Sequence, residues 1–357
     1  MGDVRDERRE VGMTILVTGG AGYIGSHMVL ALLDRGERPV VLDDLSTGFR
    51  TAVPQSVPFV QGDIEDGALV SNILAEYSID EVAHFAARTV VPDSVRDPLT
   101  YYEANTSKTR SLIATASRAG IERFVFSSTA AVYGDPAVVS VEEDMPLAPI
   151  NPYGRSKLMS EWILADAAAA HGFHYAILRY FNVAGADHSE RAGQSTLNAT
   201  HLIKVACQVA LGMRPYLSVF GTDLPTKDGT GVRDYIQVGD LAEAHVAALK
   251  HLRAGGNSLT VNCGYGHGHS VLEVISAVQR ACGKTIPVRY SPRRSGDPAA
   301  IIANVDRIRA KLDWHPEFDD LDAIVMQALS WEKRTAQNEG ALKQPASPLK
   351  QEHAGAE

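Results

Sequence analysis

The sequence predicts an α/β protein whose core is a doubly wound parallel sheet with helices on both faces. Short β-rich runs alternate with longer amphipathic stretches up to about residue 186 of the 357-residue chain. Most of these runs are continuously apolar, which is typical of strands buried on both faces of a parallel sheet. Beyond residue 186 the alternation gives way to Pro- and Gly-rich connections, so a smaller second domain is expected.

Six runs are predicted as the strands of this sheet, because each is short, apolar and bounded by turn or helix residues. In chain order they are TILVT (14–18), PVVLD (39–43), PFVQGD (58–63), EVAHFA (81–86), RFVFSS (123–128) and HYAILRY (174–180). Helical segments such as GSHMVLALLDRG and TRSLIATASRAG lie between them and end at glycine. A later run, SLTVNCG (258–264), is expected to return as a further strand.

A glycine-rich turn, TGGAGYIGSH, follows the first predicted strand. Gly19, Gly22 and Gly25 allow a tight turn, backbone approach to a pyrophosphate and close packing of helix on strand. The N–H groups at the helix start then face the phosphates. Asp43 ends the second strand, where a carboxylate binds the adenosine ribose hydroxyls and repels a 2′-phosphate. The sequence therefore predicts a Rossmann-type dinucleotide site that favours NAD over NADP, with Asp63 of GDI near the adenine.

The stretch NPYGRSK (151–157) places a phenol and an amine four residues apart. Asn151 can cap a helix and Pro152 suits its first turn, so Tyr153 and Lys157 would share one face. Lowering the pKa of a phenol from near 10 to near 7 costs roughly 4 kcal/mol. A positive charge ~4 Å away contributes about that much at an effective dielectric constant near 20. Lys157, the helix N-terminus and a cationic nicotinamide ring have the right sign, which indicates a proton-abstracting pair beside a cofactor.

Three hydroxyl groups end the fifth predicted strand, in FVFSSTAAVYG (124–134). They belong to Ser127, Ser128 and Thr129. Side chains at the carboxyl end of a parallel strand face the ligand crevice. One of these hydroxyls is therefore expected to relay a proton between a substrate hydroxyl and Tyr153.

Composition excludes several classes of function. The formal net charge of −9 argues against a nucleic-acid partner, because phosphate backbones need basic stripes. No apolar run approaches the ~18 residues of a membrane span. The three cysteines form no C-x-x-C pair and are expected to be reduced thiols in a cytoplasmic protein. His267 and His269 lack nearby carboxylates or thiols, so no metal site is expected.

Taken together, these motifs resemble the extended short-chain dehydrogenase/reductase family and, within it, the UDP-glucose 4-epimerases. The resemblance covers about residues 13–333 and includes VTGGAGYIGSH, GDI, HFAA, SSTAAVYG, NPYGRSK, LRYFNVAGA, DGTGVRDYI, SVLEV and RRSGD. It implies interconversion of UDP-glucose and UDP-galactose through a transient 4-keto sugar, with Tyr153 as the base. It also implies NAD as cofactor, a UDP-sugar as the bound partner and a homodimer.

The resemblance further implies roles for individual residues. The catalytic group would be Thr129, Tyr153 and Lys157. Cofactor contacts would come from Gly19, Gly22, Tyr23, Ile24, Gly25, Asp43, Asp44, Asp63, Ile64, Phe85, Ala86, Asn105, Tyr153 and Lys157. Substrate contacts would come from Thr129, Asn182, His201, Leu202, Arg233, Arg294, Asp297 and Ile301. The two arginines suit a diphosphate because a guanidinium binds such oxygens in a bidentate manner.

Several positions differ from the common family pattern. They are VPDSV (91–95), Lys108, Lys204, which replaces a usual Pro, and Gln237. The family places a residue near carbon 2 of the sugar, where a bulky Tyr goes with exclusion of N-acetylated sugars. Ile301 occupies that position, so acceptance of UDP-N-acetylglucosamine is expected.

Other functions on the same fold stay open. One is a different nucleotide-sugar 4-epimerase, acting on UDP-N-acetylglucosamine or on a UDP-uronate or UDP-pentose. Another is a 4,6-dehydratase or decarboxylase, although dehydratases carry an Asp-Glu pair where this chain has Ala130 and Ala131. A third is a catalytically silent NAD-sensing regulator, although such proteins tend to lose the Tyr–Lys pair.

The predicted domain organisation follows from these assignments. Residues 13–185 would form the NAD-binding domain, rejoined by a segment near 232–264. Residues 186–231 and 265–335 would form the UDP-sugar domain. The charged start (1–12) and the polar, Pro-containing end (336–357) are expected to be disordered tails.

Overall fold

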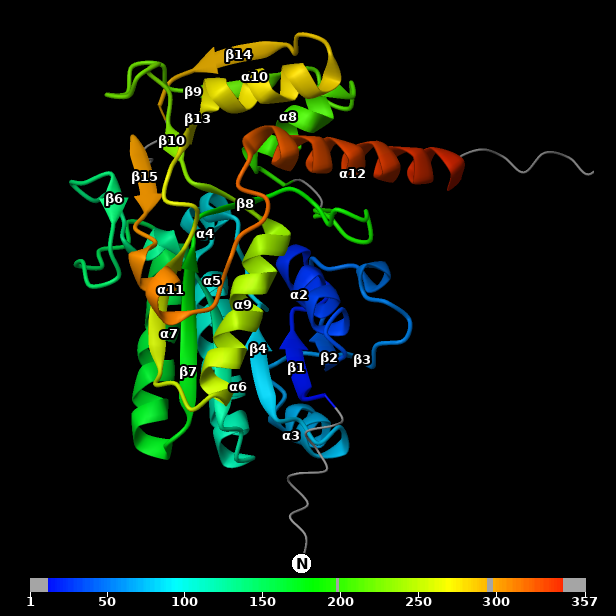
Figure 1. Cartoon of the computed structure of the whole chain (residues 1–357), viewed down its shortest axis with the longest axis vertical. Helices are drawn as coiled ribbons and strands as arrows, with labels where there is room; N and C mark the ends of the chain where they lie inside the picture. The colour runs from blue at the N-terminus through cyan, green and yellow to red at the C-terminus, as the bar shows by residue number, and fades with distance from the viewer. Residues whose placement is uncertain (1–11, 197–198, 294–297, 343–357) are drawn as a thin grey trace, which may run out of the picture.

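The centre of the computed structural model, which describes residues 12–196, 199–293 and 298–342, is a seven-stranded parallel sheet (Figure 1). Its strands are β1 (Thr14–Thr18), β2 (Arg38–Asp43), β3 (Phe59–Gln61), β4 (Glu81–His84), β5 (Arg123–Thr129), β7 (His174–Tyr180) and β12 (Leu259–Cys263). They lie in the order β12-β7-β5-β4-β1-β2-β3. The predicted fold class is confirmed, and the run 258–264 does return to the sheet, as β12 beside β7.

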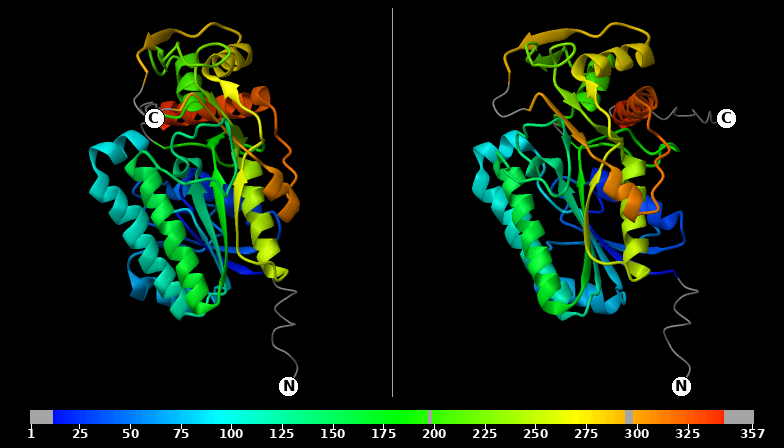
Figure 2. Two further views of the ribbon diagram at one scale, coloured as in Figure 1. Left: turned by 90° about the vertical axis from the view of Figure 1, so that its left-hand side faces the viewer. Right: turned by 60° about the vertical axis from the view of Figure 1, so that its left-hand side comes forward.

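Helices cover both faces of the sheet (Figure 2). One face carries α2 (Tyr23–Leu33) and α9 (Val238–Arg253), and the other carries α3 (Gly67–Glu76), α6 (Lys108–Arg118) and α7 (Pro152–His171). Within β1, Ile15 and Val17 belong to one hydrophobic core and Leu16 to the other. This alternation is what a strand buried on both faces requires. Among the helices of the described ranges, none is long and apolar enough to cross a membrane.

A smaller layer lies beyond the carboxyl ends of the strands (Figure 1). It contains α8 (Leu202–Ala210), α10 (Val271–Cys282) and α12 (Leu321–Leu342). Short strands complete it: β8 (Asn182–Ala184) with β11 (Tyr235–Gln237), β9 (Leu217–Phe220) with β14 (Val288–Ser291), and β6 (Ser140–Val141), β10 (Val232–Arg233), β13 (His269–Ser270) and β15 (Ala300–Ala303) in a fourth sheet. This layer therefore faces the edge at which parallel sheets bind ligands.

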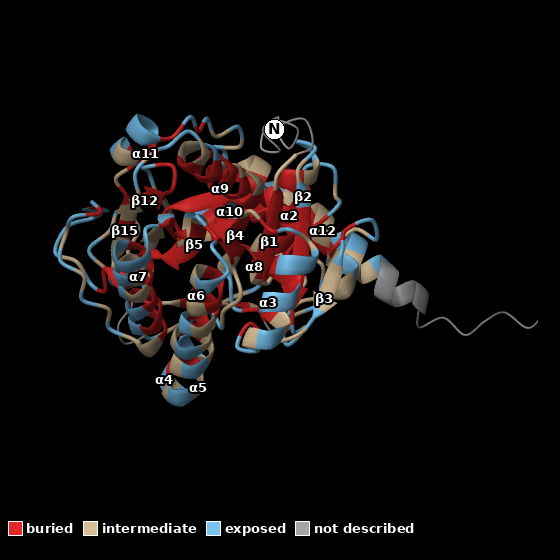
Figure 3. Cartoon of the chain, turned by 90° about the horizontal axis from the view of Figure 1, so that it is seen from below, coloured by how far each residue is buried: buried red, intermediate tan, exposed pale blue. Residues whose placement is uncertain are grey.

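Short helical segments connect the larger elements. They are η1 (Arg50–Ala52), α4 (Val91–Arg96), α5 (Pro98–Tyr102), the π-helical turn η2 (Glu103–Ser107), η3 (Ala130–Val132) and α11 (Asp306–Lys311). Figure 3 shows that the central sheet is buried, whereas α4 and α5 project from the body with exposed surfaces. These two helices pack against α7, so they extend the helical layer on that face.

The C-terminal helix corrects one predicted boundary. The sequence predicts a disordered tail from residue 336, but α12 continues to Leu342. The stretch from Ala336 to Leu342 contains Ala, Gln, Glu and Leu, which are good helix formers, and only Asn338 and Gly340 weaken it. Propagating an existing helix adds one hydrogen bond for each residue that is ordered, so a polar stretch is readily included. The remaining tail residues, 1–11 and 343–357, lie outside the described ranges.

Candidate active site

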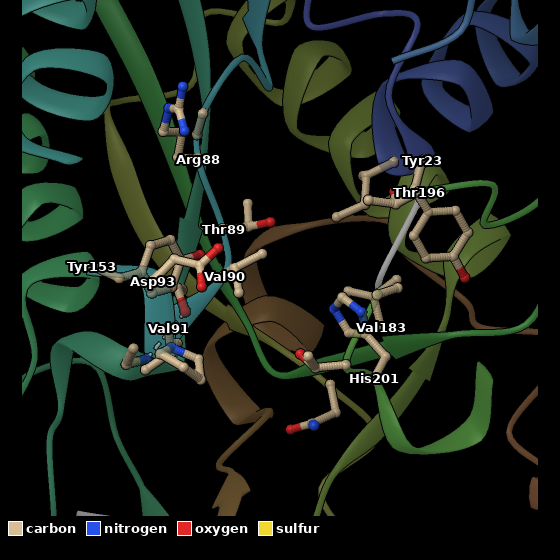
Figure 4. Close-up of a pocket in the computed structure, with 18 of the residues that line it drawn as sticks. Tyr23, Arg88, Thr89, Val90, Val91, Asp93, Tyr153, Val183, Thr196 and His201 are labelled. Atoms are coloured by element: carbon tan, nitrogen blue, oxygen red, sulfur yellow. Dashed lines mark hydrogen bonds between the residues drawn. The ribbon is translucent and has the colours of Figure 1, made fainter. Parts of the chain in front are cut away.

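A cavity of about 1320 Å³ lies between the carboxyl edge of the central sheet and the smaller layer. One end is lined by the glycine turn and by the ends of β2 and β3, and the other by α8, β10 and β15. Figure 4 shows Tyr153 with Thr89, Val90, Val91 and Asp93 on one side of the cavity, and His201 with Val183 across from them. Its volume exceeds the roughly 300–1,000 Å³ of a pocket for one drug-sized ligand. The cavity can therefore hold a dinucleotide together with a second nucleotide.

The glycine turn is shaped for close approach of a ligand to the backbone. Gly19 adopts a φ of +71°, and a Cβ there would lie 2.5 Å from the backbone nitrogen of Ala86. A Cβ on Gly25 would lie 2.1 Å from the carbonyl oxygen of Gly19, so helix and turn pack without side chains between them. Gly22 is the N-cap of α2 and contributes only backbone. The first N–H groups of α2 consequently form an anion site of the kind that holds a pyrophosphate.

Asp43 lies beside this turn at the end of β2 and lines the cavity. Its carboxylate accepts hydrogen bonds from the backbone N–H groups of Ala21, at 2.9 Å, and Leu45, at 2.8 Å. Burial raises the pKa of Asp43, and these two hydrogen bonds oppose the shift. Asp44 is exposed and lines the same end of the cavity. The turn and the acidic strand end together fit the phosphates and ribose of an adenine dinucleotide.

We expect Asp43→Ala to weaken NAD binding and to narrow the preference for NAD over NADP, because no carboxylate would then oppose a 2′-phosphate. Asp43→Asn removes the charge but keeps an oxygen that can accept a hydrogen bond from the turn, so it separates electrostatics from local structure. Titration of each cofactor into the purified variants measures both effects. Asp44→Ala serves as the matched control, with a smaller change. Tighter binding of NADP than NAD by the parent protein would refute the assignment.

The adenine end contains a lysine that the sequence analysis did not assign to a ligand. Asp63 and Ile64 follow β3 and line the cavity as predicted positions for the cofactor. The ammonium group of Lys108, at the start of α6, pairs with the carboxylate of Asp63 and lies 4.0 Å from that of Glu65. The hydrogen bond to Asp63 raises the pKa of Lys108. Any ligand that binds at the adenine end would therefore contact the Asp63 carboxylate while it is paired with the Lys108 ammonium.

The predicted catalytic group assembles at the middle of the cavity. Asn151 caps α7 by accepting a hydrogen bond from the N–H of Gly154 at 2.8 Å. Tyr153 and Lys157 consequently lie on one face of α7, and both line the cavity while being 8% and 3% exposed. Thr129, at the end of β5, is hydrogen-bonded to the phenol of Tyr153. Cap, strand end and helix face thus bring the three residues together.

The electrostatics of this group are dominated by burial. Burial raises the pKa of Tyr153 to about 12, and the hydrogen bond from Thr129 opposes that shift. Burial lowers the pKa of Lys157 to about 7, and the negative charge of Glu161 opposes it. The Lys157 ammonium lies 4.3 Å from the centre of the Phe126 ring. Among the protein's own groups, burial outweighs the Thr129 hydrogen bond, so a base at Tyr153 needs further positive charge beside it, which the sequence analysis assigned to Lys157, the helix N-terminus and a nicotinamide ring.

The three hydroxyls at the end of β5 have different partners. Thr129 and Ser127 line the cavity, and Ser127 is hydrogen-bonded to the phenol of Tyr180. Ser128 is instead hydrogen-bonded to the buried carboxylate of Glu161. Side chains alternate between the faces of a strand, so only every second hydroxyl can reach the cavity. Of the three candidate hydroxyls, the structure joins Thr129 to Tyr153.

The opposite end of the cavity contains five of the predicted substrate residues. They are Asn182, His201, Leu202, Arg233 and Ile301. Arg233 and Ile301 are register partners in the parallel pair of β10 and β15, so they occupy the same stretch of wall. His201 precedes α8 and is its N-cap. Four separate elements therefore contribute to this end, and their side chains are polar except for Leu202 and Ile301.

Three predicted positions are not among the residues described as lining the cavity, two of them because their structure is not described. Arg294 and Asp297 lie outside the described residues. Asn105 lies one layer behind the wall, in the π-helical turn. Its amide is hydrogen-bonded to the backbone N–H and carbonyl of Arg88 and to the hydroxyl of Ser156. In this structure Asn105 supports the loop after β4 and does not contact the cavity directly.

Sequence reasoning missed most of that loop. Residues 87–93 follow β4 and line the cavity together with the predicted Phe85 and Ala86. Arg88 contributes a guanidinium group and Asp93 a carboxylate. The signal was available, because the loop after a parallel strand at the carboxyl edge of the sheet is where ligands bind. Tyr180, at the end of β7, was missed for the same reason.

Comparison with known proteins agrees with this geometry. The model of the NAD dependent epimerase/dehydratase family matches residues 15–264. The UDP-glucose 4-epimerase of Azospirillum brasilense is 55% identical over 331 residues, which are 93% of this chain and 95% of that protein. The crystal structure of UDP-glucose 4-epimerase from Brucella ovis in complex with NAD is 43% identical, with a TM-score of 0.87, and the match covers 89% of this chain and 98% of that one.

A further solved structure, the UDP-Glc/GlcNAc 4-epimerase from Campylobacter jejuni, is 46% identical with a TM-score of 0.80 and covers 90% of this chain and 100% of that one. Similarity at this level over almost the whole length of the chains shows family membership, including the NAD cofactor. The chain therefore belongs to the NAD dependent epimerase/dehydratase family and, within it, to the UDP-glucose 4-epimerases.

Proposed function

We propose that the protein interconverts UDP-glucose and UDP-galactose by oxidising carbon 4 of the sugar to a transient ketone and reducing it on the other face. The observation that carries this proposal is the convergence of Tyr153, Thr129 and Lys157 at the middle of the cavity. The dinucleotide end lies on one side of this group and the polar end on the other. A sugar attached to a nucleotide in the polar end would reach the phenol from that side.

In the proposed reaction, the phenolate of Tyr153 is the base for the sugar 4-hydroxyl. The hydroxyl group of Thr129 relays the proton from the sugar to Tyr153. When held by the glycine turn and Asp43, NAD⁺ would supply the two-electron acceptor for carbon 4 and a positive charge. Lys157 adds a second positive charge, so the pKa of Tyr153 is lowered from its buried value. Burial of Tyr153 and Lys157 also limits the water around the ketone.

The polar end is proposed to hold the UDP group. Arg233 carries a guanidinium that suits a diphosphate, and Asn182 and His201 add hydrogen-bonding groups beside it. The predicted contributions of Arg294 and Asp297 belong to the same proposal. If the UDP group stays bound while the 4-keto sugar rotates in the site, the returning electrons can reach the other face of carbon 4.

The test is turnover of UDP-galactose by the purified protein without added NAD, with UDP-glucose measured as product. An epimerase that retains its cofactor reaches an equilibrium mixture of the two sugars. A 4,6-dehydratase would instead accumulate a 4-keto-6-deoxy sugar. Bound NAD without conversion of any UDP-sugar would identify a silent sensor and would refute the proposed activity.

A second substrate is favoured by Ile301, which is 6% exposed and lines the polar end of the cavity. One neighbour in the comparison is described as acting on both UDP-Glc and UDP-GlcNAc. Relative to Tyr, an Ile side chain frees about four heavy atoms, whereas an acetamido group in place of a hydroxyl adds about three. We therefore propose that UDP-N-acetylglucosamine is also a substrate.

Ile301→Tyr is expected to abolish turnover of UDP-N-acetylglucosamine selectively and to leave that of UDP-glucose within a few-fold, because only the acetyl group needs the freed volume. NMR of the anomeric signals, with each pure substrate, measures both rates. Ile301→Val is the matched control that keeps the space. No acetylated product from the parent after UDP-galactose has equilibrated would reject this second activity.

We also propose that the protein is a homodimer. The neighbouring helices α4, α5 and α7 expose large apolar side chains, namely Val95, Leu99 and Trp162, at 63%, 78% and 57% exposure. Covering such residues with a second copy of the chain removes apolar surface from water, which stabilises the dimer. Light scattering during size exclusion should give twice the mass of the chain, and Leu99→Glu with Trp162→Glu should give the monomer. A monomeric parent would contradict the proposal.

A further inference from the structure

A buried ion pair lies behind the wall of the substrate end of the cavity. It joins the ammonium group of Lys204, in α8, to the carboxylate of Glu332, in α12. The two residues are 7% and 3% exposed. Gln208, one turn after Lys204 in α8, donates a second hydrogen bond to the same carboxylate at 3.0 Å. The C-terminal helix is thereby tied to α8 through buried charge.

Lys204 also reaches the segment that precedes α8. Its ammonium donates a hydrogen bond to the main-chain carbonyl of Gln194 at 2.5 Å. The side-chain nitrogen of Gln194 lies 2.8 Å from Nδ1 of His201. Both Gln194 and His201 line the main cavity. A continuous series of contacts therefore connects Glu332 to a side chain in the cavity wall.

These contacts determine what His201 offers to a ligand. An amide NH₂ group can only donate, so Nδ1 of His201 accepts from Gln194 and the ring proton is on Nε2. Although the His201 side chain is exposed to the cavity, desolvation by the surrounding protein lowers its pKa, and the positive charge of Lys204 lowers it further. The ring is consequently neutral at pH 7, with Nε2–H as a donor. Such a donor suits a phosphate or carbonyl oxygen of the nucleotide.

The helix α12 also holds the segment before Gln194. A Cβ on Gly193 would lie 2.4 Å from the Trp331 ring, so the backbone packs directly on that ring. The guanidinium of Arg334 donates to the carbonyl oxygen of Glu190 at 2.6 Å. A void of about 20 Å³, which has room for one water, lies between β8, Gln194, α8 and α12. Helix α12 thus supports the wall over several residues.

We propose that the Lys204–Glu332 ion pair positions Gln194 and His201 in the substrate end of the cavity, so that the C-terminal helix is part of the apparatus that binds the nucleotide sugar. The inference rests on the proposed function for the identity of the ligand. It assigns Lys204 and Glu332 as positioning residues, because neither needs to touch substrate. Their effect is expected on binding and not on the chemical step at Tyr153.

Stability alone is a weak reason for such a pair. The cost of removing two charges from water often equals or exceeds their attraction, so apolar side chains of similar volume can replace a buried pair with little loss of stability. Removing one partner alone leaves an unpaired buried charge and destabilises the fold. The double replacement therefore separates positioning from stability. It removes the hydrogen bond to the Gln194 carbonyl without leaving a lone charge.

The experiment compares the parent with the double variant Lys204→Met/Glu332→Met. We expect a thermal midpoint close to that of the parent, a KM for UDP-galactose raised at least 10-fold, and kcat within threefold. The dissociation constant of UDP alone should rise by a similar factor, while that of NAD should stay unchanged.

The control is Glu81→Met/Arg253→Met, which replaces the ion pair between the buried Glu81 and the partly exposed Arg253 at the other end of the sheet. Both residues also have a second ionic partner, Arg123 and Glu37 respectively, so this control is the more destabilising of the two double variants but should leave KM unchanged.

A second variant keeps the test decisive if the double replacement fails to fold. Gln194→Leu removes the hydrogen bond to His201 and leaves the ion pair in place, so it should raise KM and the UDP dissociation constant by the same mechanism. Parental KM and UDP affinity in whichever variants fold would overturn the inference. If the parent lacks epimerase activity, the proposed function fails, whereas UDP titration still measures positioning.

Discussion

Tyr153→Phe is expected to lower turnover by at least about 10²-fold, which is the smaller end of the contribution of a general base. The variant loses the phenol oxygen, which is the final acceptor of the sugar 4-hydroxyl proton in the proposed reaction. The ring keeps its buried position between α7 and β5, so fold and bound NAD should be retained. Turnover of UDP-galactose, together with cofactor content after purification, measures both effects.

Tyr101→Phe provides the matched control for this change. Tyr101 is also buried and lines the same cavity, but its hydroxyl donates to the carbonyl oxygen of Val90 at 2.6 Å. Losing that hydrogen bond costs about 1 kcal/mol of stability and removes no proposed base. Turnover of Tyr101→Phe should therefore stay within a few-fold of the parent. If Tyr153→Phe epimerises at close to the parent rate, Tyr153 is not the base.

Lys157→Met is expected to lower turnover at pH 7 and to move the acid limb of the pH profile to higher pH. Activity requires the phenolate of Tyr153, so the acid limb follows the pKa of that phenol in the complex. Burial raises this pKa to about 12 despite the hydrogen bond from Thr129, and nearby positive charge lowers it. Removing the lysine leaves the pKa higher, so more alkaline solution is needed to form the base.

The size of the effect has an upper bound of about 10³-fold, since a charge ~4 Å from the phenol is worth about 4 kcal/mol at an effective dielectric constant near 20. The pKa of Lys157 is about 7, so its charge is present in acid solution and is progressively lost as the pH rises through 7. Lys108→Met is the control, because that lysine lines the cavity at the adenine end. An unshifted acid limb in Lys157→Met would mean that another group sets the pKa of Tyr153.

Local sequence features determined the parallel sheet, the dinucleotide turn and the pairing of Tyr153 with Lys157. Each depends on interactions within a few residues: continuous apolar runs, glycines at fixed spacing, and a helix cap that places i and i+4 on one face. The position of Asp43 at the end of the second strand could be predicted in the same way, because the strand end and the loop after it are adjacent in the sequence. These inferences hold before any distant residue is placed.

Only the tertiary structure decided the features that depend on burial and on residues far apart in the chain. Burial raises the pKa of the Tyr153 phenol, and the alternation of β5 separated Ser128 from Thr129. Lys204 and Glu332 are 128 positions apart, and no local pattern marks them as partners. Desolvation and long-range contact are properties of the assembled layers, so a sequence that specifies the site's parts does not by itself state which of them are charged, dry or joined.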